Sequence, residues 1–418
     1  MSERLSTGYP AVTRGRLVLW GMLGALPFGG MVWQVYHYAV ALRRLGFDVW
    51  YVEDSDRPVY DPVGQNPTMD CAANVELLAR CMQRIGLGDR WVFRPPGVPD
   101  AVLGATDYAG LKRLYRDCVA AINLCGAQEQ RDIHDVIACR IYLETDPVEN
   151  QVAVAKGHQG VIASLAAHDV HFTYGENLGA ADCPVPLERF AWRSTRPPVC
   201  VDLWERGGAG LVDAPVADDN SDALTTIAKW SHQSSDIAWK GYDSKDVVWK
   251  EHVWRWSKRQ EFVRFIDLPR DAVLPLEIAL ATNLPADLEL LHAAGWRTRP
   301  AATLNDPAAY RDYIRGSRGE FTVAKDQYVA PRTGWFSDRS VCYLAAGRPV
   351  VTQDTGFSKF MPAGEGLFGY ASREQALAAI AAIRDDPARQ SAAASEIARE
   401  YFGAEKVVRR MLESCGLM

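Results

Sequence analysis

The chain has 418 residues, which is too many for one ordinary hydrophobic core and predicts two domains. Hydrophobic residues make up 48% and charged residues 23%, as is typical of a globular enzyme. The formal net charge of −6 argues against a broadly basic surface and so disfavours nucleic acid as the main partner. Nine cysteines, without a CxxC pair or a Cys/His metal spacing, predict reduced thiols in a cytoplasmic protein with no metal site.

The first fifty residues predict two strands joined through a helix. In order they contain an apolar run (16–22), a loop with Gly29 and Gly30, a helical pattern (31–45) and a second apolar run (47–52). This is a βαβ unit, which implies a parallel sheet with the glycine loop at the carboxyl end of the first strand. The stretch 17–42 has no charged residue, but glycines and Pro27 interrupt it, so we prefer strand, loop and helix to a membrane span.

The loop with Gly29 and Gly30 allows two interpretations. The glycines either let the backbone approach a ligand closely, or form a tight turn that needs positive φ. The loop does not match GxGxxG, yet Glu53 and Asp54 follow the second strand as an acidic residue does in dinucleotide-binding folds. An oxidoreductase with a Rossmann fold therefore stays open as an alternative.

Later segments continue the alternation and predict an α/β fold with doubly wound sheets. Helical patterns cover 74–85, 111–122 and 239–265, and strand patterns cover 136–143, 170–174, 199–203 and 225–230. Asp146 and Glu176 each follow a predicted strand, where ligands of such sheets bind. Either carboxylate is a candidate general base for a hydroxyl group, although Asp146 also suits a helix start.

The segment 333–357 is the most informative part of the chain. Ser337 or Asp338 can cap a short helix, which Gly347 ends before a buried strand begins. Free N–H groups at that helix start, beside Ser337, Arg339 and Ser340, predict a cradle for phosphate.

A second polar loop follows that strand at the same edge of the predicted sheet. It consists of Asp354, Thr355 and Gly356. Lys325, together with Arg332, adds positive charge ahead of the helix. Two loops of this kind can grip a nucleoside diphosphate between them.

This segment resembles the donor-binding core of GT-B glycosyltransferases, and the likeness in pattern is greatest to the retaining, family-four-like members. The matching run is 343–351, followed by Asp354, Thr355 and Gly356. The resemblance covers roughly the last hundred residues. One departure is that many retaining members carry two glutamates, at places that here hold Gly334 and Cys342. Asp338 is the nearest substitute for the glutamate that usually holds the donor ribose.

The resemblance implies two doubly wound, Rossmann-like domains that face each other across a cleft. Residues 1–197 would bind the acceptor and residues 198–418 the nucleotide sugar, with the last helices free to pack back on the first domain. Ser337, Arg339, Ser340 and Lys325 would hold the diphosphate, Asp354, Thr355 and Gly356 the sugar, and Gly29 and Gly30 would approach the donor or acceptor. Cations and N–H groups would make a metal unnecessary.

The implied activity is transfer of a sugar from a nucleoside-diphosphate donor, such as a UDP sugar, to an acceptor hydroxyl. No cofactor besides the donor substrate is implied. The alternatives are a sugar-nucleotide epimerase on the same fold, the oxidoreductase above, and an inactive sugar-nucleotide-binding protein. The sequence does not specify the sugar, the base, the acceptor, the stereochemistry or the oligomeric state.

Overall fold

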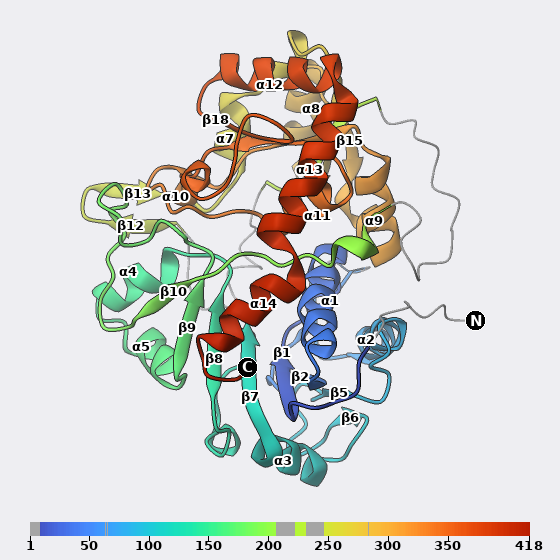
Figure 1. Ribbon diagram of the computed structural model, residues 1–418, viewed down its shortest axis with the longest axis vertical. Coiled ribbons are helices and arrows are strands. Elements are labelled where there is room, and N and C mark those ends of the chain that lie inside the picture. Colours follow the sequence, from blue (N-terminus) through green and yellow to red (C-terminus); the bar gives the residue numbers. More distant parts are fainter. Residues whose placement is uncertain (1–8, 63, 65, 206–221, 231–245, 283) are drawn as a thin grey trace.

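A computed structural model describes residues 9–62, 64, 66–205, 222–230, 246–282 and 284–418. Two β-sheets, each covered by helices, form the upper and lower halves of the molecule in Figure 1. The first sheet uses residues up to Ser194 and the second begins at Leu224. The predicted boundary at 197/198 lies between the two sheets and stays a proposal.

The first sheet has the strand order β10-β9-β8-β7-β1-β2-β5-β6. Its neighbouring strands are parallel, except for the antiparallel pair β5 and β6. The strands are β1 (Arg16–Trp20), β2 (Asp48–Glu53), β5 (Trp91–Phe93), β6 (Leu103–Gly104), β7 (Cys118–Leu124), β8 (Arg140–Glu144), β9 (Val170–Thr173) and β10 (Trp192–Ser194). The predicted βαβ unit is present, with β1 and β2 paired in parallel.

The second sheet has the order β15-β14-β11-β16-β17-β18 and is parallel throughout. The strands are β11 (Leu224–Lys229), β14 (Leu276–Ala281), β15 (Arg297–Pro300), β16 (Gly319–Thr322), β17 (Val350–Gln353) and β18 (Leu367–Tyr370). Two hairpins stand apart from the sheets: β3 (Val59–Asp61) with β4 (Asn66–Thr68), and β12 (Val247–Trp249) with β13 (His252–Trp254).

Helices cover both sheets. Those of the first half are α1 (Gly29–Arg44), α2 (Ala72–Arg84), α3 (Tyr108–Asp117), α4 (Glu149–Ala155) and α5 (Gln159–Ala166). Those of the second half are α7 (Arg259–Arg264), α8 (Pro285–Ala293), α9 (Pro307–Gly316), α10 (Asp326–Val329), α11 (Asp338–Ala345), α12 (Arg373–Asp385), α13 (Pro387–Phe402) and α14 (Ala404–Glu413). Within the described residues, no helix has the length and apolar character that a membrane crossing requires.

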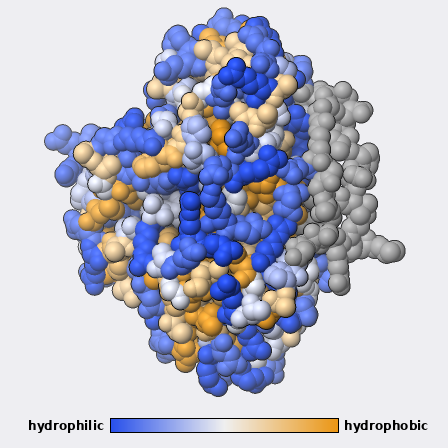
Figure 2. Space-filling view, in the orientation of Figure 1, coloured by the Kyte–Doolittle hydropathy of each residue, from blue (hydrophilic) through white to orange (hydrophobic). Residues whose placement is uncertain are grey.

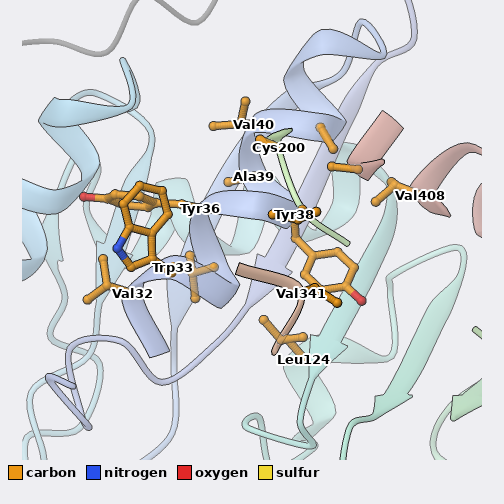
Figure 3. Packing of buried hydrophobic residues seen from close by; sticks show 14 of the residues in the cluster. Val32, Trp33, Tyr36, Tyr38, Ala39, Val40, Leu124, Cys200, Val341 and Val408 are labelled. Carbon is orange, nitrogen blue, oxygen red and sulfur yellow. The ribbon is translucent and has the colours of Figure 1, made fainter. Parts of the chain in front are cut away.

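One hydrophobic cluster runs through both halves, with α1 at its centre. Trp33 and Tyr38 of α1 belong to the same buried cluster as Val341 of α11 and Val408 of α14 (Figure 3). Such a helix must be apolar on nearly every side, which explains the uncharged stretch around it. The halves are therefore joined by a continuous core.

The last helix returns to the first half and packs against α1 (Figure 1). The Val199 N–H donates to the Phe402 carbonyl at 2.8 Å, and the Ala404 N–H donates to the Val199 carbonyl at 3.0 Å. Hydrophilic residues cover the middle of the face in Figure 2, where α13 and α14 cross from one sheet to the other. The two helices thus bury an apolar face and present a polar one.

Three predicted elements were wrong. The expected helix 111–122 divides into α3 and the central strand β7, because no turn residue marks the change at Cys118. The described part of 239–265 forms the β12–β13 hairpin and the short helix α7 instead of one long helix. The expected strand 199–203 contains a short 3₁₀ turn.

Gly29 is a point of close approach between the halves. A Cβ at this position would lie 2.5 Å from the Leu304 carbonyl oxygen and 2.8 Å from Cβ of Tyr310. At Gly30 the nearest atom, the Tyr310 hydroxyl, would lie at 3.5 Å, which is an ordinary contact. Neither glycine has positive φ among the described residues, so the tight-turn interpretation was wrong. In this structure Tyr310 fills the space beside them.

We expect Gly29→Ala to destabilise the protein by about 1–3 kcal/mol, because the added methyl group overpacks the junction. The matched control Gly30→Ala should be neutral or stabilise by up to about 1 kcal/mol, since alanine favours a helix over glycine. Thermal unfolding of the two variants measures the difference. Equal stability of the two variants would contradict the proposed close contact.

Candidate functional site

A pocket of about 190 Å³ lies at the carboxyl edge of the second sheet. It is lined by Ile227, Ala228, Lys229, Trp256, Lys258, Lys325 and Arg339. Four of these seven side chains are cationic, and they come from the end of β11, the segment before α7, the segment after β16 and the first turn of α11. Gathered like charges repel one another unless an anion lies between them, so the pocket is suited to an anionic ligand.

Lys258 is the most unusual of these cations. Its side chain belongs to a residue with 9% exposure, and among the described residues its ammonium group has no hydrogen bond or ion pair. Burial, and then the nearby Arg339 guanidinium, hold the pKa of Lys258 well below its usual range. The carboxylates of Glu320 and Asp146 act in the opposite direction but do not offset the burial, so a bound anion would favour the charged form of Lys258 further.

Arg339 lines the same pocket but is held firmly by the protein. Its Nε donates to Glu320 Oε1 at 2.5 Å, Nη1 to the Ile227 carbonyl at 2.7 Å, and Nη2 to Thr322 Oγ1 at 2.9 Å. The sequence analysis predicted Arg339 as a ligand of the diphosphate. The structure makes it a fixed charge whose position depends on Glu320.

Lys325 connects the pocket to the first half of the chain. Its Nζ donates to Asp146 Oδ1 at 2.9 Å and to the Tyr328 hydroxyl at 3.1 Å. It also lies 3.1 Å from the centre of the Trp256 ring, as a cation–π contact. The Tyr328 hydroxyl donates to the same Asp146 oxygen. Asp146 and Lys325, predicted in different domains, are therefore direct partners.

The start of α11 faces the first half more than the pocket. Ser337 caps the helix by accepting from the Arg339 N–H at 3.3 Å, and the buried Ser340 hydroxyl has no partner among the described residues. Asp338 accepts hydrogen bonds from Gln34 Nε2 at 3.1 Å and from the Tyr174 hydroxyl at 3.4 Å. Burial, followed by the charge of Asp146, raises the pKa of Asp338 from 3.8 to about 7.

Glu176 is held in an ion pair. Both of its carboxylate oxygens accept from the Arg196 guanidinium, with Nη2 to Oε2 at 2.9 Å. Arg196 also donates to the Phe360 carbonyl at 3.2 Å. A carboxylate engaged on both oxygens is poorly placed to accept a proton from a substrate hydroxyl. This geometry favours a structural role, in which Glu176 links the two halves.

The loop of Asp354, Thr355 and Gly356 is largely occupied with its own structure. Asp354 Oδ1 accepts from the Gly356 N–H at 2.8 Å, and the Thr355 hydroxyl donates to the Trp335 carbonyl at 2.6 Å. None of the three lines the pocket. Their predicted contact with the sugar stays a prediction.

Gly334 occupies one of the two places where the resemblance would lead us to expect a glutamate. It has φ of +76°, and a Cβ there would lie 2.6 Å from the Asn177 backbone nitrogen. Asn177 in turn donates its N–H to the Thr333 carbonyl at 2.9 Å. The second such place, Cys342, is buried and donates to the Asp338 carbonyl at 3.2 Å.

The acidic residues after β2 do not form a ribose site. Glu53 accepts from the Gly24 N–H at 2.5 Å and the Ala25 N–H at 2.9 Å, and burial raises its pKa to about 7. Asp54 is fully buried and accepts from the Tyr115 hydroxyl at 3.0 Å. Both carboxylates thus serve the loop and core of the first half, which removes the basis of the oxidoreductase alternative.

Lys258 was missed by the sequence analysis. A signal for Lys258 did exist. It stands at the N-cap of α7, where Ser, Thr, Asp or Asn is preferred and where a positive charge opposes the helix dipole. Assigning one long helix to 239–265 concealed this position.

No protein-family model matches the sequence, and no match was found among curated proteins. Solved structures do resemble it. An α-glucosyltransferase in complex with UDP and a 13-mer DNA containing an HMU base has a TM-score of 0.58 and 11% identity, covering 96% of this chain and 99% of the other. Anabaena Alr3699/HepE in complex with UDP has a TM-score of 0.53 and 12% identity, covering 96% of this chain and 100% of the other. AviGT4, a glycosyltransferase involved in avilamycin A biosynthesis, has a TM-score of 0.50 and 12% identity, covering 96% of each chain.

All three are GT-B glycosyltransferases. The chain has the GT-B fold. The predicted fold class of two doubly wound α/β domains is therefore confirmed. At this level of identity the likeness establishes the GT-B fold alone, and it does not test the narrower likeness to retaining, family-four-like members. Of the two halves of this fold, the second contains the cationic pocket and the first contains Asp146.

Asp338 should make stability depend on pH at the junction of the halves. Its pKa is about 7 in the folded chain and 3.8 ordinarily, so the folded state binds its proton more tightly. The stabilisation is fully present below about pH 4 and is lost as the pH rises through about 7. We compare the melting temperature of Asp338→Asn with that of the wild type at each pH. We expect this difference, variant minus wild type, to be larger at pH 8 than at pH 5 by roughly 2 °C or more. A constant difference across that range would contradict this assignment.

Proposed function

We propose that this protein is a glycosyltransferase that moves a sugar from a nucleoside-diphosphate donor to an acceptor hydroxyl. The observation that carries the proposal is the pocket with four cations, one of them the buried Lys258 without a partner among the described residues. The GT-B fold and the UDP bound in similar structures support it. An anion with two charges fits this pocket better than a neutral ligand does.

The pocket cations would act on the leaving group. As the glycosidic bond to the donor breaks, negative charge builds up on the diphosphate and must be stabilised. Arg339, fixed by Glu320, offers a preorganised charge that needs no rearrangement. Lys258 and Lys325 would contact the phosphate oxygens directly. We propose that these groups make a metal unnecessary, and that no cofactor besides the donor takes part.

The finer features of the reaction are proposals of the same kind. We propose a UDP sugar as the donor, with a hexose or pentose as the transferred group. Asp146, and not Glu176, would orient or activate the acceptor hydroxyl, since Glu176 is occupied by Arg196. Ser337 and Ser340 would add hydrogen bonds at the start of α11. We also propose that the enzyme works in the cytoplasm.

Lys258 gives the sharpest test of the diphosphate site. We expect UDP, GDP, TDP or CDP to raise the melting temperature of the wild type, since a ligand at 100 times its Kd adds about 2.7 kcal/mol. Lys258→Met keeps the apolar stem but removes the charge. It should weaken binding at least about tenfold, or about 1.4 kcal/mol, in calorimetric titration. Its own melting temperature should equal or exceed that of the wild type, because the polar end of a buried lysine is gone.

The matched control is Lys156→Met at an exposed position on the end of α4. It removes the same charge from the chain and should leave binding unchanged. If no nucleoside diphosphate binds the wild type, the proposed function is wrong. If binding survives in Lys258→Met, the diphosphate lies outside this pocket.

A further inference from the structure

The ion pair of Asp146 and Lys325 joins the two halves at the rim of the pocket. Asp146 follows β8 in the first sheet, and Lys325 follows β16 in the second. Lys325 Nζ is 2.9 Å from Asp146 Oδ1, and the same lysine lines the pocket. The one ammonium group thus serves both a carboxylate of the first half and the anion site of the second.

The two partners are held to different degrees. The Asp146 side chain is 45% exposed, whereas that of Lys325 is 15% exposed and lies against the Trp256 ring. Water can therefore solvate the Asp146 carboxylate when Lys325 leaves it, and Lys325 stays beside the pocket. Solvent exposure on the Asp146 side weakens the ion pair, so a stronger anion can displace the carboxylate.

A diphosphate is that stronger anion. It carries about two negative charges, and it would meet Lys258 and Arg339 as well as Lys325. Asp146 meets Lys325 and the Tyr328 hydroxyl. The neighbouring cations therefore favour the diphosphate as the partner of Lys325.

We infer that a bound donor diphosphate takes Lys325 from Asp146 and thereby frees the Asp146 carboxylate to face the acceptor hydroxyl. This inference rests on the proposed function. Asp146 without donor is neutralised by Lys325, and an acceptor hydroxyl then finds its oxygen already occupied. With donor in place the carboxylate loses the charge of Lys325 and keeps the Tyr328 hydroxyl, so it can accept a further hydrogen bond from the acceptor hydroxyl. The donor therefore binds first and makes the acceptor site competent. The ion pair couples the two substrates through a single lysine.

The coupling makes an unusual prediction for affinity. If Asp146 competes with the ligand, Asp146→Asn should bind UDP at least threefold more tightly than the wild type while losing most of its transfer activity. A merely structural role for Asp146 would weaken binding or leave it unchanged. Lys325→Met should bind at least tenfold more weakly. The double variant combines Asp146→Asn with Lys325→Met. Its affinity should differ from that of Lys325→Met alone by less than 1.5-fold, because the lysine for which Asp146 and the ligand compete is gone.

The experiment titrates the full chain calorimetrically with UDP and separately with inorganic pyrophosphate, which reports on the diphosphate site whatever the base. Asp182→Asn is the control for loosening of the two halves. Asp182 pairs with Lys359 at 2.6 Å and with Arg332 at 2.9 Å across the same junction, away from the pocket-lining residues. It should leave both affinities unchanged.

The outcomes separate the two proposals. If the wild type binds neither UDP nor pyrophosphate, the proposed diphosphate site fails and the coupling fails with it. If the wild type binds but Asp146→Asn binds equally or more weakly, the coupling alone is overturned. The coupling is also overturned if Asp146→Asn tightens binding equally in the Lys325→Met background, because the effect would then come from the general change in charge. It is overturned as well if Asp182→Asn tightens binding equally, because the effect would then come from loosening of the two halves.

Discussion

The burial of α1 between the two sheets is the constraint on which the remaining structure depends. The helix packs on β2 below it and on α9, α11 and α14 of the second half. Because almost every side of it is covered, the helix carries no charged residue before Arg43 and Arg44 in its last turn, and each half needs the other to complete its core. This shared core sets the distance between the carboxyl edges of the sheets. The polar contacts at the junction, including those of Asp338 and Asp146, form only when that distance is kept.

The cationic pocket lowers the stability of the folded chain, and the hydrophobic core compensates for this loss. Lys258 is buried beside Arg339 and Lys325, and burial without a counter-ion destabilises the folded chain. The large hydrophobic clusters on either side offset this cost. The lowered pKa of Lys258 makes its proton easier to lose in the empty site, whereas a bound anion favours the charged form. Stability and affinity are thus opposed in the same few residues.

Local patterns in the sequence predicted the parts that depend on local physics. The βαβ unit at the amino end and the segment that forms α11 and β17 follow from hydrophobic periodicity, caps and breakers within short windows. The strand β7 was not predicted, because its apolar residues continue the helical spacing of α3 without a turn between the two elements. Tertiary context alone decides between the two conformations at such a place.

The site depended on pairings that no local pattern encodes. Asp146 and Lys325 are separated by 179 positions, and Glu320 and Arg339 meet only because β16 and α11 lie side by side. Lys325 and Arg339 both line the pocket and their role as diphosphate ligands stays a prediction, while the partners that hold them could not be predicted. Glu176 is a further example, since its place at a strand end gives no sign of Arg196, which the fold brings against it.

Gly334 limits what this position can hold. A glutamate there would place a side chain on a left-handed backbone and against the Asn177 nitrogen, so this single substitution does not fit the present loop. The loop and its neighbour in the first half would have to move together. A carboxylate near this point of the junction can therefore come only from another position, such as Asp338.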